Sequence, residues 1–210
     1  MGVLSTKLKS GAGFTPHITK DYVWGFTLIE LLVVCGIIVL LSAMVFLNYR
    51  GGEREFALLG ATHKLAQDIR RTQEMAMSSK ELLSGQIPPG GYGVVFEKYT
   101  EAGLTNYNIY IYADLNGNEK YTSGEEIETI YKKSDGIYLE KEVKIKEVRV
   151  DGSTFDKISI NFKPPDPTIK IFESGGGTPY SLITITLAQE GDESKTKIIT
   201  VNSVGLIDID

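Results

Sequence analysis

An apolar stretch near the amino terminus contains a single charged side chain. Residues 26–47 read FTLIELLVVCGIIVLLSAMVFL, and Glu30 is the only charged residue among them. A helix of this length, at about 1.5 Å per residue, would be roughly 33 Å long, which is enough to cross a hydrocarbon core of about 30 Å. We therefore expect residues 26–47 to form a transmembrane helix.

The carboxylate of Glu30 is the costly member of this stretch. A hydroxyl such as that of Thr27 or Ser42 can bond to a backbone carbonyl one turn earlier in the helix, but we expect no such local solution for an ionised glutamate. A carboxylate inside lipid costs a few kcal/mol on insertion scales, so we expect Glu30 to have a partner on another chain. The alternative is that Glu30 lies close to the interface and reaches the headgroups, as in an ordinary membrane anchor.

The sequence that begins at Gly25, GFTLIELLVV, resembles the cleavage and methylation motif of type IV pilins and of type II secretion pseudopilins. The resemblance implies that a prepilin peptidase cuts between Gly25 and Phe26, that the new amino terminus on Phe26 is N-methylated, and that Glu30 acts in assembly. A neighbouring subunit's amino terminus is a cation at the right depth, and opposite charges attract strongly in a low dielectric. The implied partners are other pilin or pseudopilin subunits, the prepilin peptidase and an inner-membrane assembly platform.

Residues 1–25 are then a cytoplasmic leader. They contain three lysines and have no apolar core, so they differ from a secretory signal peptide. Positive charge before the apolar stretch favours a cytoplasmic amino terminus, with the rest of the chain periplasmic or extracellular, although Arg50 and Arg54 oppose this orientation. The leader is longer than many in the family, and Val23 and Trp24 stand where a charged or small polar residue often precedes the glycine.

The pattern remains helical after the apolar stretch. Apolar residues such as Leu58 and Leu65 recur at steps of three and four, which predicts an amphipathic extension of the helix over residues 48–80. Gly51 and Gly52 interrupt the pattern, and we expect them to weaken or bend the helix into a flexible joint outside the membrane. The prolines and glycines of LLSGQIPPGG should end the helix near residue 80.

Residues 81–210 have the pattern of β-structure. Eight or nine short segments alternate apolar and polar residues and are separated by Gly, Asp, Asn or Pro. One long helix followed by strands predicts an α+β fold with an antiparallel, β-rich, pilin-like domain whose helix covers one sheet face. The element order and the hairpin IYIYADLNGNEKYTSGEE resemble minor pseudopilins of the GspH/FimT type.

The same hairpin contains a candidate metal site. Asp114, Asn116, Asn118 and Glu125 occupy positions one, three, five and twelve of a calcium-loop spacing, which makes calcium the only cofactor that the sequence indicates. The sixth position, normally glycine, is Glu119, and the flanking segments are predicted strands rather than helices. An Asn-Gly turn with a solvated acidic tip is the plainer alternative.

Composition argues against several other functions. The net charge of −5 disfavours nucleic acid as a partner. The two histidines, His17 in the leader and His63 on the predicted helix, exclude a histidine-based triad or a histidine-rich metal centre. We expect no enzymatic activity. The single cysteine, Cys35, lies in the apolar stretch, so the β-rich domain can contain no disulfide.

The resemblance, together with these observations, implies a structural, minor subunit of a type IV pilus or a type II secretion pseudopilus in the inner membrane. Two alternatives stay open. A DNA-uptake pseudopilin of the competence type would need a basic face, for which Lys141, Lys144, Lys146 and Arg149 are the candidates, although strand alternation should place some of them on opposite faces. A membrane-anchored sensor or enzyme that never polymerises is the other alternative.

Overall fold

The computed structural model describes residues 25–165, 169–173 and 176–210, so the predicted leader, apart from Gly25, lies outside the described residues. Residues from Leu47 to Asp210 form one compact unit, called the globular unit below, and the described residues before Leu47 belong to another. In the described part, one α-helix precedes nine strands and a short 3-10 helix, which confirms the predicted α+β class with antiparallel sheets. The elements are α1 (Leu28–Met77), β1 (Tyr92–Glu101), β2 (Leu104–Ala113), β3 (Glu126–Tyr131), η1 (Lys133–Asp135), β4 (Val143–Val150), β5 (Lys157–Phe162), β6 (Ile169–Glu173), β7 (Leu182–Gln189), β8 (Asp192–Asn202) and β9 (Ile207–Ile209).

The helix α1 ends close to where the sequence predicts. Ser79 has a left-handed backbone conformation with φ of 47°, and the N–H of Lys80 donates to the carbonyl of Met75 at 3.0 Å. This geometry satisfies a carbonyl of the last turn and stops the helix. The helix α1 continues through Gly51 and Gly52 without a break, and the flexible joint expected there stays a prediction. A helix tolerates an interior glycine at a cost of about 1 kcal/mol each.

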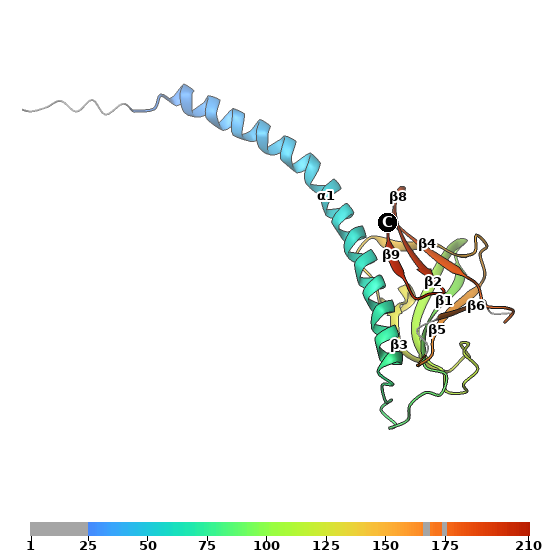
Figure 1. Cartoon of the computed structure of the whole chain (residues 1–210). Coiled ribbons are helices and arrows are strands. Elements are labelled where there is room, and N and C mark those ends of the chain that lie inside the picture. Colours follow the sequence, from blue (N-terminus) through green and yellow to red (C-terminus); the bar gives the residue numbers. More distant parts are fainter. Residues whose placement is uncertain (1–24, 166–168, 174–175) are drawn as a thin grey trace, which may run out of the picture. The chain divides into compact units, whose positions relative to one another are not determined.

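The globular unit contains two antiparallel sheets. The first has the strand order β3-β2-β1-β5-β6, and the second has the order β4-β7-β8-β9. Figure 1 shows the strands of the globular unit gathered beside the part of α1 that belongs to it. Alternate residues of both sheets, together with one side of α1, form a single apolar core. Because every strand neighbour is antiparallel, each strand can expose one face while it buries the other.

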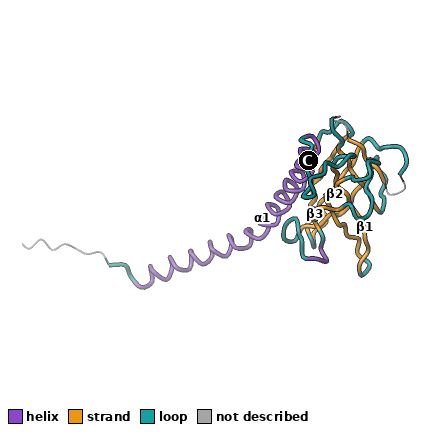
Figure 2. The backbone as a smooth tube through the Cα atoms, turned by 90° about the horizontal axis from the view of Figure 1, so that it is seen from below, coloured by secondary structure: helices purple, strands orange, loops and turns teal. Residues whose placement is uncertain are grey.

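The part of α1 in the globular unit lies between the edge strands of the two sheets. Arg71 forms two hydrogen bonds of 2.8 Å with the carboxylate of Glu128 on β3. Arg70 donates to the carbonyl of Ile207 on β9 at 3.0 Å. Two adjacent arginines therefore bond one to each sheet, and Leu65, which precedes them in α1, is fully buried. Figure 2 shows this end of α1 beside the strands.

Candidate functional site

The start of α1 provides a local partner for Glu30. The backbone N–H of Glu30 donates to the hydroxyl oxygen of Thr27 at 3.2 Å. In return, the N–H and the hydroxyl of Thr27 both donate to the carboxylate of Glu30 at 3.4 Å. This reciprocal arrangement is a capping box, in which the side chains of the cap residue and of the third helical residue satisfy backbone N–H groups at the start of the helix.

The capping box corrects one expectation from the sequence. We expected Glu30 to have no local solution, whereas its carboxylate reaches the N–H of Thr27 three residues earlier. The signal was present in the sequence, because the spacing Thr27-Leu28-Ile29-Glu30 is the pattern of a capping box. At 3.4 Å these contacts are long for hydrogen bonds, and they leave the carboxylate exposed, with lone pairs free for a stronger partner.

The predicted processing site precedes this cap. Gly25 and Phe26 have no regular secondary structure, and 79% of the Phe26 surface is exposed. No heavy atom outside the neighbouring residues lies within 4 Å of the position that a Cβ on Gly25 would occupy. The Gly25–Phe26 bond is therefore uncovered by the described chain, and the helix begins only two residues after it.

The apolar stretch itself is exposed along its described length. From Leu28 to Val45 no residue is buried, and in the part of the chain that the structure describes this is the only helical segment long and apolar enough to cross a membrane. A soluble fold rarely leaves so large a contiguous apolar surface in water. The segment therefore needs lipid or other apolar helices around it.

The predicted calcium loop is the second candidate site, and its first carboxylate is bonded to the backbone of the loop. Asp114 is fully buried. One of its oxygens accepts N–H groups from Gly117 at 2.7 Å and Asn118 at 3.3 Å, and the other accepts the N–H of Glu119 at 2.6 Å. Three backbone donors thus hold this buried charge, which offsets the cost of removing it from water.

The closing carboxylate of the loop is bonded in the same way. Glu125 accepts the N–H of Leu115 at 3.2 Å and the side-chain amide of Asn116 at 2.9 Å on one oxygen, and the N–H of Thr122 at 2.8 Å on the other. Both carboxylates therefore point into the loop from its two ends. The loop is closed by its own hydrogen bonds.

The glycines before β1 make room for Asp114. A Cβ on Gly90 would lie 1.7 Å from a carboxylate oxygen of Asp114, and a Cβ on Gly91 would lie 2.1 Å from the carbonyl oxygen of Phe162. The backbone of Asp114 also bonds to this segment, with its N–H donating to the Gly91 carbonyl at 3.0 Å. The sequence PPGG, which follows the end of the helix, therefore packs directly against the loop.

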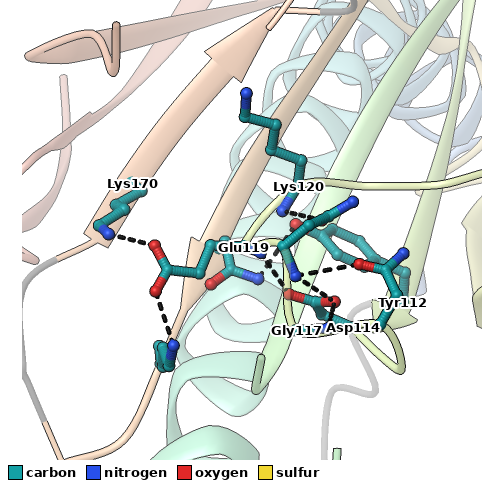
Figure 3. Close-up of polar contacts among 10 residues, drawn as sticks. Tyr112, Asp114, Gly117, Glu119, Lys120 and Lys170 are labelled. Carbon is teal, nitrogen blue, oxygen red and sulfur yellow. Dashed lines mark hydrogen bonds and ion pairs between the residues drawn. The ribbon is translucent and has the colours of Figure 1, made fainter. Parts of the chain in front are cut away.

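The tip of the loop lies over the outer face of the first sheet. Tyr121 packs edge-on against Tyr112, with ring centroids 5.4 Å apart, and burial raises the pKa of Tyr112. Glu119 forms ion pairs with Lys163, at 2.7 Å, and with Lys170 on β6 (Figure 3). Hydrogen bonds from these two lysines lower the pKa of Glu119 below its usual value of 4.5.

The four predicted metal ligands come together in this loop, but their oxygens already have protein partners. Asn116 accepts the N–H of Asn118 at 3.0 Å, and Asn118 accepts the N–H of Lys120 at 2.7 Å. Among the described residues, no group of three or more His, Cys, Asp or Glu side chains is arranged to hold a metal ion. The geometry is that of a turn held by its own side chains, and calcium binding by Asp114 and Glu125 stays a prediction.

The basic residues proposed for DNA contact lie on β4 or just before it. Lys141 precedes β4, whereas the other three lie on it. The register of β4 against β7 shifts between Ile145 and Glu147, so that Lys146 is an extra residue. This β-bulge resets the alternation and brings Lys144 and Arg149 to the outer face of the sheet, so the expectation of opposite faces is wrong.

Acidic neighbours bind these cations. Lys144 forms an ion pair with Glu193, and Lys146 donates to the backbone carbonyl of Glu193 at 3.1 Å. Arg149 pairs with Glu147 at 2.7 Å. Lys144 and Arg149 are already paired with carboxylates, which weakens their attraction for phosphates.

The chain was compared with models of known protein families, with curated proteins and with solved structures, and none of the three comparisons gave a match.

Proposed function

We propose that this protein is a minor structural subunit of a type IV pilus or of a type II secretion pseudopilus, anchored in the inner membrane by residues 26–47. A prepilin peptidase would remove the leader between Gly25 and Phe26 and N-methylate Phe26. The observation that supports this best is found at the start of α1. There the motif GFTLIELLVV, which resembles that of pilins, coincides with the exposed carboxylate of Glu30 in an exposed apolar segment. The globular unit has its own core and would remain outside the membrane.

The chemistry of assembly depends on an exchange of partners by Glu30. Removal of the leader leaves an ammonium group on Phe26, next to Thr27, whose N–H is the present partner of the carboxylate. A neighbouring subunit's ammonium group carries a full positive charge, whereas the N–H of Thr27 is only a dipole. In lipid, where the effective dielectric is low, the ion pair is the stronger interaction. Each Glu30 would then fix the axial position of the next subunit.

Packing in such a fibre follows from the distribution of apolar residues. The exposed segment Leu28–Val45 would bundle with copies or relatives of the same helix, which supplies the apolar surroundings that it lacks in the single chain. The sequence contains no phosphate-binding loop between a strand and a helix, so other proteins would power assembly.

The direct test of this proposal is Glu30→Ala in cells that contain a prepilin peptidase and the assembly machinery. Membrane insertion should be unchanged or improved, because a costly charge is removed, while incorporation into sheared fibres should fall to background. Ser42→Ala is the matched control, since it removes another polar group from the same stretch and should leave incorporation unchanged. Normal amounts of Glu30→Ala in the fibre fraction would contradict the proposed role of the carboxylate.

A non-polymerising anchor is distinguished by cross-linking. Subunits in the membrane should form a ladder of cross-linked species only in cells with the machinery, and the ladder should be absent for Glu30→Ala. A wild-type protein that stays monomeric under these conditions would favour the sensor or anchor instead.

A further inference from the structure

A groove of about 390 Å³ lies where the end of α1 meets the following loop and the edge strand β3. Its apolar lining comes from four elements: Met75 on α1, Leu82 in the loop, Tyr92 on β1 and Ile127 on β3. The hydroxyl of Tyr92 donates to the carbonyl of Lys80 at 2.6 Å, which fixes the loop against the sheet. The groove is therefore preformed.

An exposed leucine lies on the rim of the same groove. Leu83 is fully exposed, although it follows Leu82, which packs against the core. The turn that contains it is closed by two hydrogen bonds, from the N–H of Leu82 to the Gln86 carbonyl at 2.9 Å and from the N–H of Gly85 to the Leu82 carbonyl at 2.8 Å. Leu83 is thus held away from the protein by a fixed turn.

Charges of both signs surround the apolar surface. Lys80 and Glu81 lie on the loop side, and the ion pair of Arg71 with Glu128 lies on the opposite side. A partner with only acidic or only basic residues would leave one of these groups opposed by a like charge. A surface that carries the same two signs, such as the same surface of a second copy, can oppose each charge with its opposite.

We propose that this surface binds the same surface of a second copy of the chain, with Leu83 of each copy inserted in the groove of the other. Leu83 and the groove lie side by side on one surface, so two copies related by a two-fold axis can each insert Leu83 in the groove of the other. The inference concerns only the globular unit, so it stands independently of leader cleavage and of Glu30. It places a contact between copies at the end of α1 that is far in sequence from the apolar stretch.

Cysteine cross-linking of the full chain tests the contact. In a Cys35→Ala background, a chain with Leu83→Cys is co-expressed with a differently tagged chain with Ile127→Cys, purified in detergent and mildly oxidised. We expect a disulfide-linked heterodimer as a main product, because insertion of position 83 in the groove brings the two cysteines within bonding distance. The matched control pairs Ile127→Cys with Val204→Cys, since Val204 is also apolar and 75% exposed but lies between β8 and β9.

Sedimentation gives a second measurement. Leu83→Glu should remain folded by circular dichroism, because the side chain is fully exposed, and its dissociation constant for dimers should rise at least tenfold relative to Val204→Glu. Equal cross-linking of the Leu83 and Val204 cysteines would assign association to the membrane segment and overturn the proposal. A heterodimer band at background level, or equal self-association of the two glutamate variants, would also overturn it.

Discussion

Two parts of one helix show different uses of apolar residues. From Leu28 to Val45 the apolar side chains surround the helix, and none is buried by the chain itself. In the globular unit the same helix has a buried stripe with polar residues on its other sides, and Leu65 and Ile69 lie in the core. The stripe contributes to the folding of this chain. The exposed apolar segment Leu28–Val45 can be buried only by other molecules, such as lipid or apolar helices of other chains.

The acidic residues show the same difference. Asp114, in the globular unit, is fully buried and accepts three backbone N–H groups of its own loop. Glu30 is exposed and has only long contacts with Thr27. We infer that the carboxylate of Asp114 stabilises the fold, whereas that of Glu30 remains available for another subunit.

The largest expected effect is a difference in the free energy of unfolding between equal substitutions in the two parts of α1. Leu65→Ala should lower the free energy of unfolding of the globular unit by about 2–5 kcal/mol, because it removes a fully buried side chain from the core. Leu40→Ala, a matched change in the exposed segment, should leave this free energy unchanged. Chemical denaturation of the full chain in detergent, followed by circular dichroism, measures both. Similar losses for the two variants would contradict the division of the helix.

A smaller effect is expected for the acid of the loop. Asp114→Ala should lower the free energy of unfolding by about 1–3 kcal/mol, because the N–H groups of Gly117 and Glu119 lose their acceptor. Asp208→Ala, at an exposed position, is the control. A chelator tests the predicted calcium site, and an unchanged melting temperature of the wild type would argue against calcium binding. A large decrease with chelator that calcium reverses would instead support the calcium site.

The smallest effect concerns Glu119. Its pKa is lowered in the folded protein by Lys163 and Lys170, so its contribution to stability is present above its usual pKa of 4.5 and is lost as the pH falls below that value. Glu119→Gln should therefore be less stable than the wild type at pH 7 by up to about 1 kcal/mol, since the pair is partly screened by solvent. The difference should decrease toward pH 3. A constant difference across this range would contradict the ion-pair role.

Local patterns in the sequence predict much of the fold. The order of one helix followed by strands, the end of α1 before the Pro-Gly segment and the alternation in the strands depend on neighbouring residues, and the structure confirms each of them. The capping box was equally local, and Thr27 and Glu30 could have revealed it.

Features that depend on distant residues could not be predicted in this way. The division of the strands into two sheets requires pairings such as β1 with β5, and the role of Gly90 depends on Asp114, which is far along the chain. The bulge at Lys146 also depends on its partner strand β7, because alternation within β4 alone does not indicate an extra residue. The proposed assembly function depends on other molecules, and the proposal rests on the motif.

The central claim is that the chain is processed at Gly25 to give a subunit that assembles through Glu30. Mass spectrometry of the protein's amino terminus, isolated from cells with an active prepilin peptidase, tests it most directly. We predict a chain that begins at Phe26 and carries one methyl group on its amino nitrogen. A chain that keeps residues 1–25 under the same conditions would contradict the proposal.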